Sequence, residues 1–192
     1  MAGSGGYVKQ QLKSIKDLLS SLEPKCGESA VITIDGPAGS GKTTLARILS
    51  SELASSYTVH MDDLYNGWES TLTPKLSSKL REIMREVRDN SQVIFAVFDW
   101  IENSQKTEVR QPAPRYLIVE GVGSGQSAIR DFVSLALWIE VPVEEGLARV
   151  IKRDGPSVTQ YMPAFLAAQN SHFEKEETRK WADKRLSGLG TV

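Results

Sequence analysis

The amino-acid sequence predicts an α/β fold, a three-layer sandwich in which a parallel sheet of about five strands carries helices on both faces. Two observations lead to this fold class. Short apolar runs of strand length alternate along the chain with longer segments whose apolar residues recur at helical spacing. Residues 31–49 also place a strand, a glycine-rich turn and an amphipathic helix in direct succession. Because ligands bind beyond the carboxyl ends of the strands in such folds, we expect the functional site there.

Length and composition limit the classes of protein that the chain can represent. It has 192 residues, 40% of them hydrophobic, and we expect one domain over residues 1–192. A formal net charge of −1 argues against nucleic acid as a partner. Cys26, the single cysteine, and the distant His60 and His172 offer neither an intrachain disulfide nor a structural zinc site. Without a basic-then-apolar leader or a membrane-length apolar run, the sequence predicts a soluble cytoplasmic protein with no membrane partner.

The first half of the chain predicts the start of an alternating fold. Apolar residues at helical spacing favour an N-terminal helix over 7–22. The β-branched run 31–35 predicts a strand, and the amphipathic segment 42–55 predicts the helix that follows it. Residues 57–61 read as a short second strand. The segment 74–89 carries its apolar residues on one helical face and predicts the next helix.

The second half continues the same alternation. Its apolar runs predict strands, and its longer periodic segments predict helices. The strands are expected at 92–98, 116–120 and 135–141, and the helices at 143–153 and about 159–183. Residues 102–115 form a polar, proline-containing stretch, and 183–192 can hold at most one weak edge strand.

The glycine-rich turn matches the phosphate-loop pattern G-x-x-x-x-G-K-[ST] at every fixed position. Glycines let several backbone N–H groups converge on a polyphosphate, and the helix that begins near Lys42 adds further N–H donors. Lys42 would reach the β and γ phosphates, Thr43 would ligate Mg²⁺, and Thr44 would support the loop or an inner phosphate. A chance match lacks the strand before and the helix after, so we predict a P-loop NTPase fold. The predicted nucleotide-binding residues are Gly36, Pro37, Ala38, Gly39, Ser40, Gly41, Lys42, Thr43 and Thr44.

Two carboxylates follow predicted strands. Asp62 comes directly after the second strand and could touch the metal shell and accept a proton from a phosphoryl acceptor. Glu120 ends the strand 116–120 and suits a second carboxylate position at the metal. The alternatives are that Asp62 caps a helix and that Glu120 forms an ion pair with a neighbouring basic side chain. We favour the functional interpretation for both because they join the phosphate loop at strand ends, whereas Asp63 is interpreted as structural.

Two arginines are candidates for a lid. Arg149 and Arg153 are four residues apart, so they share one face of the predicted helix 143–153. From there their guanidinium groups could fold over the β and γ phosphates, in a short lid over about 149–160. The alternative is a solvated helix face.

These segments together resemble the uridine kinase group of P-loop small-molecule kinases, which is related to phosphoribulokinase and bacterial pantothenate kinase. The resemblance spans about residues 30–155. It rests on Ile34–Thr43 for the phosphate loop, Met61–Tyr65 for the Asp-x-Phe-Tyr element, Val97–Trp100 for the Tyr-Asp-Phe element, Leu117–Gly121 for the metal-site strand and Leu147–Asp154 for the lid. It implies Asp62 as general base, Glu120 with Thr43 around Mg²⁺, Arg149 and Arg153 as lid cations, and Asp99 in the acceptor pocket.

The acceptor region, about 62–115, departs from that family. Asn103 and Gln105 stand where uridine kinases commonly have a histidine and an arginine, and Phe98 replaces a tyrosine. Altered polar residues imply an altered acceptor, so uridine is one candidate among others. The predicted acceptor-binding residues are Tyr65, Trp68, Asp99 and Trp100, with the helix 74–89 and the stretch 102–115 closing over them. Packing of the two tryptophans beneath mobile segments is the alternative, and His60 and Trp138 are predicted to be core residues.

The sequence therefore predicts a kinase that uses ATP and Mg²⁺ to phosphorylate the hydroxyl of a small metabolite, a nucleoside or another sugar-like alcohol. Lys42, Asp62, Arg149 and Arg153 are its predicted catalytic residues, and Thr43, Asp62 and Glu120 its metal site. One alternative is a nucleoside monophosphate kinase, for which Arg81, Arg85, Arg88, Arg110 and Arg115 could bind a second phosphate. The other is a regulatory nucleotide-binding module. A homo-oligomer is compatible with the sequence.

Overall fold

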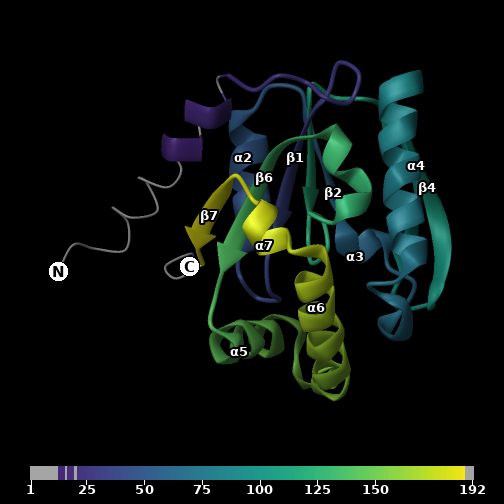
Figure 1. Ribbon diagram of the computed structural model, residues 1–192. Coiled ribbons are helices and arrows are strands. Elements are labelled where there is room, and N and C mark those ends of the chain that lie inside the picture. Colours follow the sequence, from purple (N-terminus) through teal and green to yellow (C-terminus); the bar gives the residue numbers. More distant parts are fainter. Residues whose placement is uncertain (1–12, 16, 20, 189–192) are drawn as a thin grey trace.

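A parallel five-stranded sheet organises the computed structural model, which describes residues 13–15, 17–19 and 21–188 (Figure 1). Its strand order is β2-β5-β1-β6-β7, and every neighbouring pair runs parallel. The strands are β1 (Ala30–Asp35), β2 (Ser56–His60), β5 (Tyr116–Glu120), β6 (Val133–Glu140) and β7 (Lys184–Ser187). The predicted α/β class and the predicted number of strands are confirmed. The short strand β7 is the weak edge strand expected near the C-terminal end.

Helices cover both faces of the sheet, which gives the three predicted layers. On one face α2 (Lys42–Glu52) packs Leu45 and Leu49 against Ile32 and Ile34 of β1. Ile15, from the helical residues 13–15 and 17–19, joins this cluster. The predicted N-terminal helix is thus found for those residues, and its residues 7–12 lie outside the described part of the chain.

The opposite face carries the larger hydrophobic cluster. Alternate residues of the same strands point to it, with Val31 of β1 and Val119 of β5 fully buried. They pack with the apolar face of α4 and with Phe165 of α6. The elements on this side are α3 (Met61–Leu64), η1 (Trp68–Ser70), α4 (Pro74–Asn90), η2 (Ser127–Phe132) and α6 (Met162–Glu176).

One predicted strand does not belong to the parallel sheet. The run 92–98 forms β3 (Gln92–Asp99), which pairs antiparallel with β4 (Ser104–Pro112) in a separate two-stranded sheet beside α4 (Figure 1). The polar stretch 102–115, for which no strand was predicted, contains β4. Most of β4 is exposed, so its residues are polar, while β3 buries Val93 and Phe95. A hairpin that packs only one face needs no apolar run in its outer strand.

The C-terminal part crosses the carboxyl edge of the sheet. Here α5 (Val143–Asp154) and η3 (Pro156–Gln160) lead into α6, and α5 and α6 lie beyond the strand ends in Figure 1. The single helix predicted over 159–183 is divided, because Glu177 takes a left-handed conformation with φ of 50° before α7 (Thr178–Trp181). Trp138 of β6 is buried, as predicted. In the described part of the chain, every helix is too short or too polar to cross a membrane.

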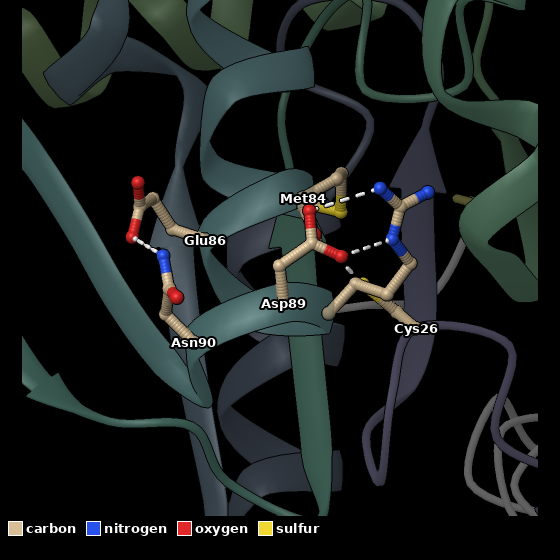
Figure 2. A network of polar contacts seen from close by, with 6 residues as sticks. Cys26, Met84, Glu86, Asp89 and Asn90 are labelled. Carbon is tan, nitrogen blue, oxygen red and sulfur yellow. Dashed lines mark hydrogen bonds and ion pairs between the residues drawn. The ribbon is translucent and has the colours of Figure 1, made fainter.

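Polar contacts join α4 to the segment that precedes β1 and link residues within the last turns of α4 (Figure 2). The Cys26 thiol donates a 3.1 Å hydrogen bond to the carbonyl of Met84, and burial raises the pKa of this thiol to about 12. Near the end of α4, Asn90 binds Glu86 over 2.8 Å, and Asp89 accepts two bonds from Arg88. Cys26 is therefore a neutral structural residue that helps to hold α4 against the segment before β1.

Candidate active site

The phosphate loop is built by close packing between backbones. Gly39 has φ of 72°, and a Cβ at this position would lie 2.1 Å from the carbonyl oxygen of Gly146 at the start of α5. A side chain cannot be accommodated there, so the loop requires glycine for its conformation and for its contact with α5. The loop thus lies pressed against α5 at the carboxyl edge of the sheet.

Unpaired backbone N–H groups converge at the end of this loop. Gly41 is the N-cap of α2, no side chain caps the helix, and its first turn holds no acid. Among the described residues, the amides of Lys42, Thr43 and Thr44 have no hydrogen-bond acceptor. Free amides at the positive end of a helix dipole bind anions, so this cradle fits the phosphates of a nucleoside triphosphate.

Lys42 lies at the centre of the loop. Its ammonium group donates to the carbonyl oxygens of Gly36 at 2.8 Å and Pro37 at 2.7 Å. The side chain is 7% exposed, and burial lowers the pKa of the ammonium group. Two carbonyl contacts hold the charge at the loop without neutralising it, which leaves the ammonium available to a phosphate oxygen.

Thr43 in the first turn of α2 meets Glu120 at the end of β5. The Thr43 hydroxyl donates a 2.9 Å hydrogen bond to Oε1 of Glu120, which also lies 2.6 Å from Nδ1 of His60. Hard oxygen donors of this kind suit Mg²⁺, which keeps waters and binds through one or two carboxylates together with phosphates. No group of three His, Cys, Asp or Glu that could hold a metal alone occurs among the described residues. The residues therefore fit a metal held jointly with a nucleotide.

His60 is not the core residue that the sequence suggested. Its side chain is 43% exposed, and it lies at the end of β2, level with Glu120 in the register of β2 and β5. The hydrogen bond to Glu120 raises the pKa of the imidazole. Strand alternation alone could not show this, because His60 is the last residue of β2 and lies at the carboxyl edge of the sheet.

Asp62 stands in the first turn of α3, on the floor of the same cleft. Its pKa is raised, first by loss of water around the carboxylate and then by the charge of Glu120. No hydrogen bond joins the Asp62 carboxylate to another described residue, while its backbone oxygen accepts from the Trp100 indole at 3.1 Å. Asp63, the next residue, does not line the cleft.

A cleft of about 1360 Å³ joins these groups to the acceptor region. Arg149 and Arg153 of α5 both line it. Arg149 donates to the carbonyl oxygens of Gly39 at 3.3 Å and Gly188 at 2.9 Å, and it pairs with Glu145. Arg153 is 61% exposed and makes two bonds to Asp154, of 2.6 and 2.7 Å. Arg149 thus contacts the phosphate loop directly, whereas Arg153 remains at the surface.

Aromatic rings form the end of the cleft where acceptor binding is predicted. Trp68 lies 5.2 Å from Trp100 and is stacked on Tyr161, with 5.0 Å between ring centroids and 1° between planes. Phe165 of α6 packs edge-on against Trp68. The Tyr65 ring is buried, and its hydroxyl donates to the Val122 carbonyl at 2.8 Å. Three of the four predicted acceptor residues are therefore brought together.

The fourth, Asp99, is not brought to the cleft. Its carboxylate accepts hydrogen bonds from the backbone amides of Ile101 and Glu102, both at 2.9 Å, and lies 3.2 Å from the Lys106 ammonium. These partners hold the pKa of Asp99 below its usual range. In this structure the residue stabilises the turn between β3 and β4.

Three residues of the site were missed by the sequence-based prediction. Gln169 of α6 is 1% exposed, and its Oε1 accepts the amide of Ala38 in the phosphate loop at 2.8 Å. Tyr161 stacks on Trp68 from a distant segment. Asp35, 2% exposed, accepts the amide of Gly36 at 2.7 Å. Only Asp35 carries a signal in the sequence, an acid directly before the loop glycine.

Comparisons with known proteins agree with this architecture. A family model described as AAA domain matches residues 32–182. A uridine kinase from Chlamydia pneumoniae is 27% identical over 82% of this chain and 81% of its own, and a cytidylate kinase from Sulfurisphaera tokodaii is 25% identical over 74% and 72%. A structure from Bacillus stearothermophilus described as a possible uridine kinase superposes with a TM-score of 0.68, covering 93% of this chain and 98% of its own at 21% identity. This last likeness concerns the fold.

Proposed function

From the premise that this chain belongs to the AAA domain family and is a uridine kinase-like P-loop kinase, we propose that it phosphorylates a hydroxyl of a small, uncharged acceptor. ATP is the proposed donor. The acceptor is a nucleoside or another sugar-like alcohol. Uridine is the first candidate because relatives of this chain are uridine kinases.

The distribution of charge in the cleft carries the proposal. Its lining cations, Lys42, Arg149 and Arg153, come from the phosphate loop and α5. On the acceptor side, the described lining residues include neither lysine nor arginine, and Glu69 is acidic. An acceptor that carries its own phosphate would need cations there. The lining therefore favours a neutral acceptor with a flat ring for the aromatic residues.

The arginines that could bind a second phosphate lie elsewhere, since none of them lines the cleft. Arg88 pairs with Asp89 and Arg110 with Glu108, Arg81 donates to the Ala128 carbonyl, and Arg115 lies over Tyr116. Arg85 lies on the exposed part of α4. This observation weighs against the nucleoside monophosphate kinase.

One feature keeps that second function as a candidate. A small pocket of about 210 Å³ shares Asn66 and Ser70 with the cleft and is lined by Lys75 and Lys79. The Lys79 ammonium donates to the Leu64 carbonyl at 3.1 Å and has further donors free for an anion. A cytidylate kinase is among the relatives, so monophosphates belong in any substrate screen.

Each residue has a proposed role in transfer. Lys42 and the loop amides bind the β and γ phosphates, and Arg149 and Arg153 reduce the negative charge around the transferred group. Asp62 orients the acceptor hydroxyl and accepts its proton, a role that suits a carboxylate of raised pKa. Thr43 and Glu120, with Asp62, would hold Mg²⁺. When bound, that ion would neutralise charge on the phosphates.

Closure of the cleft would exclude water from the reaction. The short lid from Arg149 to Gln160 ends next to Tyr161, whose ring stacks on Trp68 of the acceptor region. We infer that this contact closes the acceptor end of the cleft and favours transfer over hydrolysis.

A cytoplasmic location, the absence of a nucleic-acid partner and the oligomeric state stay predictions.

Release of ADP from Mg·ATP, measured with nucleosides, nucleoside monophosphates, sugars and other alcohols, tests the proposed function. We expect at least one uncharged alcohol to raise ADP release well above basal hydrolysis. Stimulation by monophosphates alone would instead favour the monophosphate kinase. No stimulation by any compound would favour the regulatory module.

A further inference from the structure

Asp35 at the end of β1 holds a loop that carries none of the predicted catalytic side chains. Its Oδ1 accepts the amides of Gly36 at 2.7 Å and Gly123 at 3.0 Å, and its Oδ2 accepts the amide of Gly125 at 2.9 Å. The carboxylate is 2% exposed. One buried side chain therefore ties the phosphate loop to residues 121–126, the loop that follows β5.

The loop 121–126 begins directly after Glu120. Its first residue, Gly121, has φ of 132°, and a Cβ there would lie 2.5 Å from Cβ of Met61. Met61 is the residue before Asp62. Gly121, which follows Glu120, thus packs against the side chain of Met61, which precedes Asp62.

The far side of this loop contacts the acceptor region. The Tyr65 hydroxyl donates to the Val122 carbonyl at 2.8 Å, and Ser77 of α4 donates to the Gln126 side chain. Loop 121–126 therefore lies between the phosphate loop, held by Asp35, and the acceptor elements, held by Tyr65 and α4. A shift of this loop would move Glu120 and Asp62 relative to the phosphate cradle.

We propose that Asp35 is a positioning residue for phosphoryl transfer, which sets Glu120 and Asp62 against the phosphate loop by holding loop 121–126. Asp35 touches neither nucleotide nor acceptor in this role. The inference rests on the proposed function for its kinetic part, whereas its structural part concerns the protein without ligand. A carboxylate suits the task because its two oxygens can accept three N–H groups at once.

The Asp35→Asn variant tests the inference. The three hydrogen bonds that Asp35 accepts from Gly36, Gly123 and Gly125 are called the clamp. Asparagine has nearly the same shape as aspartate, but its NH₂ group would face at least one of these backbone N–H groups, so at least one hydrogen bond of the clamp is lost. Thr33→Val is the matched control, since Thr33 lies two residues earlier on the same face of β1, is fully buried, and its hydroxyl has no partner among the described residues. Gly125→Ala is a second variant that disturbs the clamp without changing the acid, because its Cβ would lie 3.3 Å from Oδ2 of Asp35.

Two measurements are combined. In hydrogen exchange of the ligand-free protein, Asp35→Asn should speed exchange within residues 121–126. The exchange rates of α4 and β6 should be the same as in Thr33→Val. In kinetics with the best acceptor, kcat should fall about tenfold or more while KM for ATP changes little, as is typical when the support of an active-site ligand is removed. Gly125→Ala should change both measurements in the same direction.

The outcomes separate this inference from the proposed function. If the wild type is active and Asp35→Asn keeps its kcat, the positioning role is overturned. A fall in kcat in Thr33→Val as large as that in Asp35→Asn would overturn it as well. A wild type that phosphorylates no acceptor contradicts the proposed function instead. The exchange measurement still decides in that case, because unchanged exchange in residues 121–126 of both clamp variants overturns the inference without any substrate. If Asp35→Asn does not fold, Gly125→Ala decides by the same two measurements.

Discussion

The hydroxyl of Thr43 lies 2.9 Å from a carboxylate oxygen of Glu120, so the helix that follows the phosphate loop and the end of strand β5 meet at one point. Thr43 and Glu120 are 77 positions apart in the sequence. Parallel pairing of β1 with β5 brings them together, because Ile34 is level with Glu120 in the register. We propose this contact as the place where a metal ion would join a bound triphosphate to the protein.

Glu120→Gln should raise the Mg²⁺ concentration needed for half-maximal activity, on the order of tenfold or more, because an amide binds a hard cation less strongly than a carboxylate. Titration of ADP formation with Mg²⁺ at saturating ATP measures the change. Glu140→Gln is the matched control, since Glu140 also ends a strand but pairs with Arg179 and does not line the cleft. If the Mg²⁺ titration curve of Glu120→Gln is the same as that of the wild type, Glu120 is not part of the metal site.

Lys42→Ala should abolish binding of Mg·ATP, because it removes the buried cation at the centre of the phosphate loop. Isothermal titration calorimetry compares this variant with Lys152→Ala, which removes an exposed cation from α5 outside the cleft. We expect measurable heat for the control and none for Lys42→Ala. Equal affinity in the two variants would contradict the assigned role.

Asp62→Asn should keep Mg·ATP binding and lose transfer by about a factor of 10² or more, since a proton acceptor is removed while the phosphate cradle stays intact. Asp63→Asn is the control, because the neighbouring carboxylate lies in the same short helix but does not line the cleft. Single-turnover transfer rates at saturating ATP give the comparison. Transfer that proceeds at the wild-type rate in Asp62→Asn would mean that another group takes the proton.

Trp68→Leu should raise the KM for the acceptor about tenfold, the loss expected when one aromatic contact of about 1.4 kcal/mol is removed. The KM for ATP should change little, because Trp68 belongs to the acceptor end of the cleft. Trp181→Leu serves as the control, since Trp181 packs under Arg130 away from the cleft. An unchanged acceptor KM in Trp68→Leu would leave Trp68 a packing residue only.

Stability should depend on pH through Asp35. Burial raises the pKa of this carboxyl to about 6 from its ordinary 3.8, so between pH 4 and 6 the folded protein binds more protons at this position than the unfolded chain does. The free energy of unfolding of the wild type, relative to Asp35→Asn, should therefore fall as pH rises through this range, by on the order of 3 kcal/mol. Denaturant unfolding at pH 4, 5, 6 and 7 measures the difference. If the free energy of unfolding of the wild type relative to Asp35→Asn rises with pH instead, the raised pKa of Asp35 is contradicted.

The phosphate loop could be predicted from the sequence because its residues are contiguous and each has a local reason. Glu120 and Asp62 could be predicted to lie near it because the ends of parallel strands meet at one edge. The hairpin of β3 and β4 could not, since the run 92–98 is equally typical of a buried parallel strand and its partner β4 is polar.

Contacts between distant segments could not be predicted from the sequence either. Gln169 and Tyr161 reach the site from a helix and a turn more than 90 positions after Trp68 or Ala38, so no local pattern marks them. Asp99 shows the opposite case, because a carboxylate that matches a family motif is engaged by the turn beside it. Which residues surround the acceptor depends on packing that spacing alone does not encode.

Product analysis tests the central claim most directly. Wild-type protein and the Asp62→Asn variant are incubated with Mg·ATP and each compound of the acceptor panel, and phosphate esters are identified by mass spectrometry and ³¹P nuclear magnetic resonance. We predict an ester on a hydroxyl of an uncharged acceptor, formed in equal amount to ADP by the wild type and almost absent with Asp62→Asn. Free phosphate as the sole phosphorylated product beside ADP, whichever alcohol is present, would contradict the account.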